Sequence, residues 1–415
     1  MDYPHLEFLE HDYAGRILDR VTLFEQGVAT WIGSAGEGAC ELLLPDVYDE
    51  RRFKVGRWLS AWARWPGEPA QHINHYLIRR RQRGRDKQRR RFLRLRALAP
   101  THILGWRVIQ SPNPYENRYA ADGYLKLVPR TESTGYFVKQ DYADDMMKDY
   151  AGQQLTRSAV PARSLATLYR FSVAPKWGLA PKQSKSAART NLLATLKGIA
   201  KAAMDDRYRP VWLDFEVVVT GYDDVFALQF QTFVGQRGRN LGLESGRPLV
   251  IVPEMTEDVS WTDDWEKAVT VVTVSGIARA STTTIANKQT AIEEGIWEFQ
   301  HMARRGEFPA NVVEAWYTMP QEGVRESLAQ EANRVLEDQG PERRLLLTLP
   351  TDGPLRLLRD VQFGDIVATR MGLQMQNARL AAAEFNQGAN DGLAIKTRLD
   401  PLDRKLPTLR LPGGM

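Results

Sequence analysis

An alternating pattern of leucine and arginine beside a glycine restricts the fold of this chain more than any other feature. Residues 75–82 (HYLIRRRQ) and 89–98 (RRRFLRLRAL) form two arms, and Gly84 lies in the short segment between them. In the second arm, leucines and an alanine alternate with arginines, which places the two kinds of side chain on opposite faces of a strand. A helix is the alternative, but the glycine and the alternation argue against it. We therefore predict a long β-hairpin over residues 77–97.

The charge of this hairpin differs from that of the rest of the chain. Residues 79–96 contain eleven Lys or Arg residues and one acidic residue, Asp86; this local charge of +10 leaves −5 for the remainder of a chain whose total is +5. The body is therefore mildly acidic and carries one concentrated basic element. We expect the basic side chains to face a neighbouring subunit or a central channel, and they are Arg79, Arg80, Arg81, Arg83, Arg85, Lys87, Arg89, Arg90 and Arg91.

A charged arm of this kind can also contact the phosphate backbone of a nucleic acid. Phe92 is the only aromatic residue within it, whereas recognition of bases in single strands depends on stacking aromatic side chains. The sequence therefore argues against sequence-specific recognition. It leaves open non-specific contact with DNA, pairing with acidic residues of another subunit, and a solvated arm without a partner.

The remaining sequence changes from β to α and back to β. Short apolar or alternating segments separated by glycine or proline predict strands within residues 20–65, 211–234, 248–276 and 343–370. Helices are predicted at residues 141–155, with Asp141 as a candidate N-cap, and at 190–204, 291–305 and 322–339. This order argues against a regular βαβ fold and predicts a mainly β (α+β) chain with helical inserts.

Several classes of function lack their sequence signals. The single cysteine, Cys40, excludes an intrachain disulfide and a thiolate metal cluster, and its apolar strand indicates that it packs in a core. His72 and His75 are three residues apart, and on a strand they would point to opposite faces, which argues against a metal pair. Because no candidate catalytic group has its partner at the required spacing, we expect no enzymatic activity and no cofactor.

The chain also lacks the sequence signals for a membrane. No apolar run has the length of a membrane helix, and the first twenty residues are too acidic and polar for a signal peptide. We therefore expect no membrane segment and a protein that works, or is assembled, where it is made.

A second glycine-containing segment, LQFQTFVGQRGRNLG (228–242), looks like a phosphate-binding loop and contains Arg237 and Arg239. Such loops need a parallel strand before them and a helix N-terminus after them. Here the preceding strand belongs to an expected antiparallel hairpin, the glycine spacing fits neither nucleotide fingerprint, and another strand follows. We predict a strand connection whose two arginines bind no nucleotide and face a neighbouring chain or a channel.

Several stretches, in sequence order, carry a resemblance to a known family. They are CELLLPDVYDERRFKVGRWLSAW, the hairpin with the following THILGWRVI, DYADDMMKDY, ARTNLLATLKGIAKAA, FALQFQTFVGQRGRNLG, VTVVTVSG and VQFGDIVATRMG. Over roughly residues 15–375 their order resembles the tail-tip hub proteins of long-tailed bacteriophages, minor tail proteins that share the baseplate-hub fold. The hairpin tip is more basic than the family pattern, and the tail after Gly372 matches no part of it.

The resemblance implies a structural virion protein without catalysis. Members of the family form a trimeric ring beneath the hexameric tail tube, and each chain supplies two tube-like β-barrel domains. On this basis we expect an N-terminal barrel domain that carries the hairpin, a helical insert, a second barrel domain with helical segments and an extended tail, over residues 1–135, 136–205, 206–375 and 376–415.

The resemblance also implies the partners and the location of the protein. The expected partners are two further copies in a homotrimer, the distal tail and tail-tube proteins, the tape-measure protein, the tip or receptor-binding proteins and, transiently, phage DNA in the channel. The expected location is the tail tip of the virion, after assembly in the host cytoplasm. Two alternatives from other classes remain: a protein that binds nucleic acid non-specifically through the hairpin, and a tail-associated cell-wall hydrolase.

Overall fold

The structure of the chain is a computed structural model. It describes residues 3–32, 38–45, 47–48, 51–110, 115–119, 125–129, 137–156, 159, 163–187, 189–205, 210–220, 226–281, 294–303, 312–318, 328–353, 355–371, 374–388 and 392–402. Among these residues, no helix has both the length and the apolar character needed to cross a membrane.

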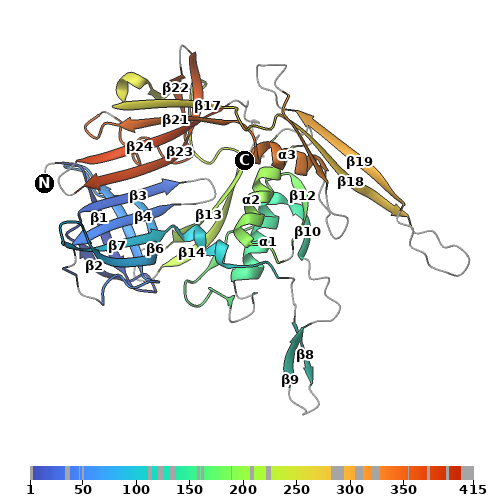
Figure 1. The fold of residues 1–415 in the computed structure, drawn as a ribbon, viewed down its shortest axis with the longest axis horizontal. Helices are drawn as coiled ribbons and strands as arrows, with labels where there is room; N and C mark the ends of the chain where they lie inside the picture. The colour runs from blue at the N-terminus through green and yellow to red at the C-terminus, as the bar shows by residue number, and fades with distance from the viewer. Residues whose placement is uncertain are drawn as a thin grey trace, which may run out of the picture.

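The chain is mainly β, as predicted, and most of its strands belong to one large sheet of 14 strands (Figure 1). These strands are β1 (His5–His11), β2 (Ile17–Val21), β3 (Gln26–Ile32), β4 (Ala39–Pro45), β5 (Trp58–Arg64), β6 (Gln71–Arg85), β7 (Arg91–Leu98), β15 (Asn240–Leu241), β16 (Val250–Ile251), β17 (Asp258–Asp264), β21 (Glu342–Leu349), β22 (Ile366–Met371), β23 (Gln374–Gly388) and β24 (Leu393–Pro401).

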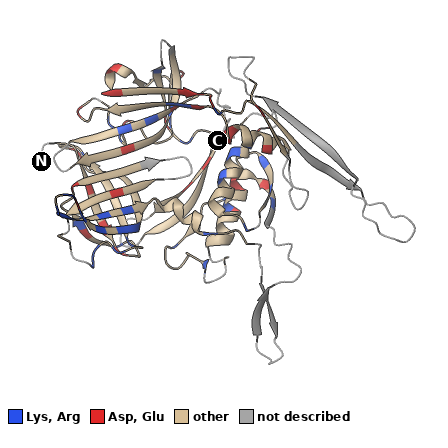
Figure 2. Cartoon of the chain, viewed as in Figure 1, with Lys and Arg blue, Asp and Glu red and all other residues tan. Residues whose placement is uncertain are grey.

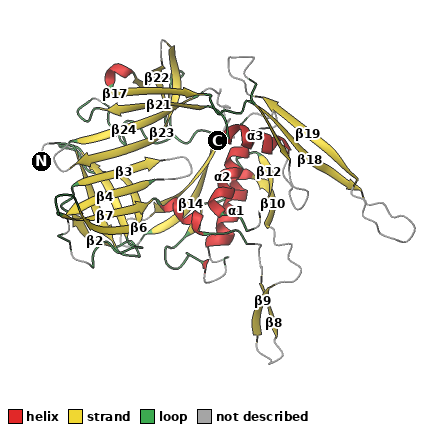
Figure 3. Cartoon of the chain, in the orientation of Figure 1, coloured by secondary structure: helices red, strands yellow, loops and turns green. Residues whose placement is uncertain are grey.

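Four smaller sheets accompany the large one. They contain β8 (Tyr115–Tyr119) with β9 (Leu125–Pro129), β10 (Phe137–Tyr142) with β12 (Lys182–Ala187), β11 (Ser172–Val173) with β13 (Leu213–Thr220) and β14 (Ala227–Val234), and β18 (Val271–Ser281) with β19 (Glu294–Ala303) and β20 (Glu314–Thr318). The α-helices are α1 (Ala143–Leu155), α2 (Leu192–Ala202) and α3 (Leu328–Asp338), and short 3₁₀ helices cover η2 (Pro100–Trp106) and η4 (Pro253–Met255). Figure 3 shows the three α-helices together on one side of the large sheet.

The large sheet joins the two ends of the chain. Its strand order is β17-β21-β24-β23-β3-β4-β7-β6-β5-β1-β2, so the C-terminal strand β23 pairs antiparallel with the N-terminal strand β3. The expected extended tail over 376–415 is therefore wrong up to Pro401, because β23 and β24 lie inside the sheet and Leu380, Phe385 and Leu399 are buried in its core. The rest of the expected tail, residues 403–415, lies outside the described residues.

The division into domains stays a prediction, as does the closure of the sheets into two tube-like barrels. The large sheet contains strands from three of the four expected parts. Strands β1–β7 lie within residues 1–135, β15–β17, β21 and β22 lie within 206–375, and β24 lies within 376–415. Boundaries drawn along the chain consequently do not separate the sheet into independent pieces.

Two hydrophobic cores support this architecture. The first lies on the large sheet and includes Phe8, Trp65 and Cys40, and burial raises the pKa of the Cys40 thiol. The expectation that Cys40 packs in a core is thus confirmed. The second core joins α1, α2, β13 and β14, and it also includes Trp58 of the large sheet, which contacts the ring of Phe226 edge-on. Complete burial of each such side chain contributes about 2 kcal/mol.

Three of the four predicted helices are present, and the fourth is a strand. Residues 291–305 were expected to be helical, but Glu294–Ala303 is β19, paired with β18 along its length. Ile296, Trp297 and Phe299 favour extended backbone, and pairing with a valine-rich partner decides in favour of the strand. The predicted cap of the first helix is also wrong: α1 begins after Tyr142 without a side-chain cap, and Asp141 accepts a hydrogen bond from the Tyr142 N–H instead.

Candidate functional site: the basic hairpin and its anchor

The predicted basic hairpin is present as β6 and β7, which pair antiparallel from Leu77↔Leu98 to Arg85↔Arg91. Its turn lies further along the chain than expected. Gly84 is a strand residue opposite Phe92, whose ring covers it so closely that a Cβ would lie 2.7 Å from the ring. The chain reverses at residues 86–90, where the Arg89 N–H donates to the Asp86 carbonyl and Arg89 has a φ of 65°.

Asp86, the single acid of the hairpin, holds this turn together. Its carboxylate accepts hydrogen bonds from the backbone N–H and the Nε of Arg90, at 2.8 and 2.7 Å. Loss of water raises the pKa of Asp86, but the hydrogen bonds from Arg90 outweigh this effect and keep that pKa below its ordinary value. Asp86 therefore serves the local turn and offsets little of the charge around it.

The register divides the basic side chains between the two faces of the hairpin. On one face Arg80 lies opposite Arg96 and Gln82 opposite Arg94, so cations oppose or flank one another. On the other face Arg81 and Arg83 lie opposite the buried Leu95 and Leu93. Of the predicted contact residues of the hairpin, Arg81 is half-buried and the others are exposed: Arg79, Arg80, Arg83, Arg85, Lys87, Arg89, Arg90 and Arg91.

The neighbouring strands offset little of this charge. The strands that flank the hairpin in the sheet, β4 and β5, contain one acid between them, Glu41, which pairs with Arg96 at 3.5 Å. At the base of the hairpin, a bulge in β6 places the Arg79 guanidinium 4.5 Å from the centre of the Trp106 ring. Figure 2 shows a band of Lys and Arg positions, in blue on the ribbon, at this end of the sheet.

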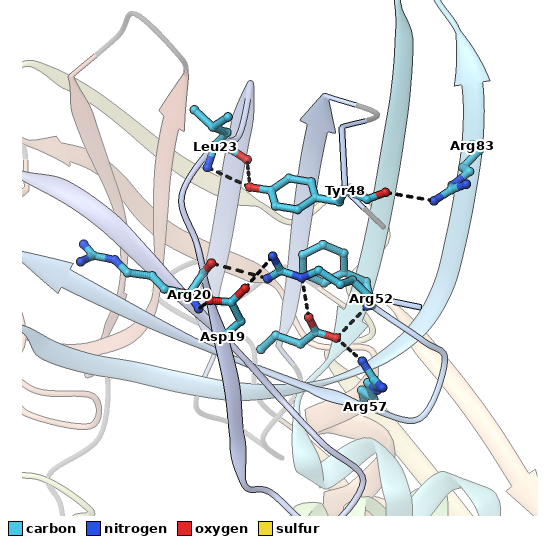
Figure 4. A network of polar contacts seen from close by, with 9 residues as sticks. Asp19, Arg20, Leu23, Tyr48, Arg52, Arg57 and Arg83 are labelled. Atoms are coloured by element: carbon cyan, nitrogen blue, oxygen red, sulfur yellow. Dashed lines mark hydrogen bonds and ion pairs between the residues drawn. The ribbon is translucent and has the colours of Figure 1, made fainter. Parts of the chain in front are cut away.

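A polar network anchors this end of the sheet, and Glu10 of β1 is its centre (Figure 4). The Glu10 carboxylate is 1% exposed and accepts hydrogen bonds from Arg52 Nε at 3.0 Å and from Arg57 Nη1 at 2.7 Å. It also accepts one from the backbone N–H of Phe53, at 2.7 Å. Arg52 extends the network to Asp19 at 2.9 Å. The two guanidinium groups compensate the negative charge of the buried Glu10 carboxylate.

Tyr48 connects this network to the hairpin. Arg52 lies over the Tyr48 ring at 4.8 Å, and the Tyr48 hydroxyl exchanges hydrogen bonds with the backbone of Leu23. The Tyr48 carbonyl, in turn, lies 3.5 Å from Nη2 of Arg83 on β6. Sequence reasoning missed Glu10, Arg52 and Tyr48 because their partners are far apart along the chain, and no short motif marks them.

The glycine-containing loop connects β14 to β15, in agreement with the predicted strand connection. Its arginines, however, are held by acids of the same chain. Arg237 pairs with Asp214 at 3.4 Å and with Glu216, and its guanidinium lies over the Phe233 ring; its side chain is 12% exposed. This guanidinium is thus already enclosed by its own chain, and contact of Arg237 with another chain or a channel stays a prediction.

Arg239 forms a second tie between this loop and the large sheet. Its Nη2 lies 2.6 Å from the buried Asp365 carboxylate, which also accepts the Arg239 backbone N–H at 2.6 Å. Gly238 is required here, since a Cβ at this position would lie 2.3 Å from the Asp365 nitrogen. The side chain of Arg239 is 51% exposed, so its contact with another chain stays a prediction.

The two histidines expected on opposite faces of a strand lie together instead. A bulge in β6 at Ile73 shifts the register, and the ring centres of His72 and His75 are 4.4 Å apart. His11 of β1 joins them, with its Nε2 2.8 Å from Ser60 Oγ. Phe226 packs on His75 at 4.5 Å. The described residues contain no group of three or more His, Cys, Asp or Glu placed to hold a metal ion.

Burial keeps these imidazoles neutral. It lowers the pKa of His72 to about 4, and it lowers the pKa of His11 and, more strongly, of His75. The cluster lies where Phe226 and Trp58 join the second core to the large sheet. Neutral rings at this junction pack as aromatic groups.

One large, mainly antiparallel sheet with a helical unit against it is a fold that this chain shares with a solved tail protein. The crystal structure of the tail protein from Neisseria meningitidis MC58 matches 96% of this chain and 97% of its own, with a TM-score of 0.52 at 14% sequence identity. The likeness confirms the tail-protein fold expected from the sequence, whereas the closure of its sheets into two tube-like barrels stays a prediction.

Two further solved structures show weaker likeness. The 43 kDa tail protein of prophage MuSo2 from Shewanella oneidensis has a TM-score of 0.49 at 12% identity, covering 95% of this chain and 98% of its own. The prophage tail protein gp18 from Listeria monocytogenes has a TM-score of 0.47 at 10% identity, covering 94% of each chain. No protein-family model and no curated protein matches the sequence.

Proposed function

We propose that this chain is a structural subunit of a phage-type tail, and that it forms the hub ring at the distal end, where the tail tube meets the tip and the host-recognition proteins. The observation that carries the proposal is the fold shared almost from end to end with a tail protein. Because both chains are covered nearly completely, the likeness concerns the whole architecture and not one common module.

The described structure supports an assembling role in two ways. First, β3 and β23 tie the two ends of the chain into one sheet, and the cores adjoin through Trp58, which makes a rigid building block. Second, the exposed arginines of the hairpin form a basic surface, and the described flanking strands β4 and β5 contribute one acid to it, Glu41. Such a surface is suited to a partner that brings negative charge.

In this proposal the chain assembles as a homotrimer in the virion and has no catalytic role. Threefold symmetry brings three hairpins together, so their charge must be compensated by acids of a neighbouring copy or by the phosphates of DNA in the channel. Tail-tube, tape-measure and tip proteins would contact the ring from its two sides. Assembly would take place in the cytoplasm of the host.

Light scattering on the purified full chain, coupled to size exclusion, tests the proposal. We expect a species of three times the mass of the chain, which is 47.1 kDa. Gold-labelled antibody against the chain should then mark one end of the tails of particles from the strain that encodes it. A strict monomer at high concentration, together with unlabelled tails, would overturn the proposal.

A further inference from the structure

An acidic strand forms one edge of the large sheet. Between Glu254 and Glu266 the chain contains six acids and no Lys or Arg, and the acids are Glu254, Glu257, Asp258, Asp263, Asp264 and Glu266. All six are exposed. They lie on or beside β17, which pairs only with β21 in the part of the chain that the structure describes. The outer edge of β17 therefore presents unpaired backbone groups next to a row of carboxylates.

Three of these six acids, Glu254, Asp263 and Asp264, have a partner among the described residues. Asp263 pairs with Arg343 of β21 at 3.2 Å, and Glu254 pairs with Arg370 of β22. For Glu257, Asp258, Asp264 and Glu266 the described residues provide no ion-pair partner. Asp264 accepts the backbone N–H of Glu266 at 2.9 Å, so within the described part of the chain Glu257, Asp258 and Glu266 are the carboxylates of this edge that no ion pair or hydrogen bond occupies.

An apolar patch lies among these acids. Val259 and Trp261 of β17 are 37% and 39% exposed. Exposed aromatic and aliphatic side chains surrounded by charge are typical of the centre and rim of a protein interface. An arginine of a partner could also stack on the Trp261 ring while it pairs with the neighbouring acids.

The acidic strand and the basic hairpin lie far apart within one chain. In the strand order β17 is first and β7 is seventh. At about 4.8 Å per strand, this corresponds to roughly 29 Å along the sheet, several times the screening length of about 8 Å at physiological salt. Figure 2 shows β17 and the hairpin on opposite sides of β23 and β3. The two charges therefore do not offset each other within a chain.

We infer that the acidic strand, residues 254–266, receives the basic hairpin of a second copy of this chain. The two surfaces are complementary in charge, −6 against +10, and each copy carries both. Their separation on one sheet makes the contact head-to-tail, which closes into a ring when the rotation between copies allows it. The inference rests on the proposed ring and names the two surfaces that would join its subunits.

Charge reversal on the two surfaces tests this pairing in the full chain. One variant carries Arg85→Glu, Lys87→Glu and Arg91→Glu on the hairpin. A second carries Glu257→Lys, Asp258→Lys and Asp264→Lys on the strand, and a third combines all six substitutions. A matched control reverses three exposed cations outside both surfaces, Arg16→Glu, Lys54→Glu and Arg247→Glu.

Assembly is measured by light scattering at about 0.1 M and about 1 M salt, and circular dichroism confirms that each variant is folded. Three reversals lower the hairpin charge from +10 to +4 and bring the strand charge from −6 to 0. We expect each single-surface variant to associate at least about 10-fold more weakly than the parent chain, and the combined variant to lose less than the sum of the two single losses, because both sets of side chains belong to one contact. The control and the parent should assemble alike, and high salt should dissociate the parent.

Two results would overturn the inference, and they have different consequences. If the single-surface variants assemble like the parent, or their losses simply add in the combined variant, the surfaces do not meet, and the ring itself stands on other contacts. In that case the carboxylates of β17 only keep the open edge soluble. If the parent chain is monomeric in every condition, the proposed self-assembly fails as well.

Discussion

The ring centres of His72 and His75 lie 4.4 Å apart although both residues belong to strand β6 and are separated by an odd number of positions. A regular strand would place them on opposite faces, and the bulge at Ile73 places them on one. His11 completes the cluster, with its ring centre 5.7 Å from that of His75. Three imidazoles at this spacing cannot all be charged without strong mutual repulsion.

The stability of the fold should therefore depend on pH below neutrality. Burial lowers the pKa of His72 from 6.5 to about 4, so the unfolded chain binds this proton more readily than the folded chain. The associated stability is fully present above pH 6.5 and is lost as the pH falls toward about 4, by about 3 kcal/mol for this group. Urea unfolding between pH 7.5 and 4.5 measures the loss.

The variant His72→Gln provides the control for this prediction. Glutamine does not titrate, so the decrease between pH 6.5 and 4.5 should be smaller in the variant by about 2 kcal/mol, although its stability at pH 7.5 is lower than that of the parent. If the stability of the parent and of the variant decreases equally as the pH falls, protonation of His72 does not cause the decrease.

Loss of the Glu10 charge should destabilise the end of the sheet that carries the hairpin. Glu10→Gln removes the anion that pairs with Arg57, which is 18% exposed, and leaves Arg52, which is 20% exposed, with Asp19 as its remaining acidic partner among the described residues. Removal of one partner of such a buried pair costs about 3 kcal/mol, and chemical unfolding measures it. The control is Asp19→Asn, where the carboxylate is 59% exposed and the expected loss is below about 1 kcal/mol. Equal effects of both variants would contradict the central place of Glu10.

The loop over residues 235–242 should bind no nucleotide. Arg237 is enclosed by Asp214, Glu216 and the Phe233 ring, and Arg239 is paired with Asp365, so neither guanidinium is available for a phosphate without breaking an internal tie. Equilibrium dialysis with ATP, GTP and NAD at millimolar concentration is expected to show no saturable binding. Saturable binding that is abolished by Arg237→Ala and Arg239→Ala would refute this prediction. The same Arg237→Ala variant should lose about 2 kcal/mol of stability, because the buried Asp214 carboxylate loses the cation that pairs with it.

The success of sequence reasoning differed between local and long-range features. Alternation predicted the hairpin and the pair β13–β14, since it reports directly on which face of a strand is buried. Pairing between distant strands was not predictable in the same way. The sequence of β19 alone predicted a helix, and most of β23 was assigned to the tail, because neither sequence shows the partner strand, β18 or β3.

Side chains whose role depends on a distant segment were also beyond local patterns. Asp144 and Asp145 fit the acidic first turn of a helix, but both carboxylates also accept backbone N–H groups of residues 177–180. The acids that pair with Arg237 and Arg239 are likewise contributed by other elements. The Arg237 side chain is therefore largely buried, although the sequence of its loop suggests exposure. The charge of the hairpin was visible in sequence, but the partner that compensates it was not.

The hairpin should be required for assembly of the ring. Arg79, Arg80, Arg83 and Arg85 are exposed, and Arg81 is half-buried beside them, so replacement of these five by serine removes a charge of +5 while the β6–β7 pairing and the Asp86–Arg90 turn remain. We expect trimer formation to weaken by at least about 10-fold in light scattering, and high salt to have the same effect on the parent chain. Arginine is suited to this contact because it forms bidentate pairs with carboxylates and tolerates burial at interfaces.

A control variant and a second measurement separate the three interpretations of this arm. Arg16→Ser, Lys54→Ser and Arg247→Ser also remove exposed cations but lie outside the hairpin, so this variant should assemble like the parent. If the five-serine variant assembles normally but particles that contain it fail to deliver DNA, the hairpin faces the channel, where it would contact phosphates and weaken with salt. If neither assembly nor DNA delivery changes, the intersubunit and channel hypotheses both fail. The hairpin is then a solvated arm with one internal acid, Asp86.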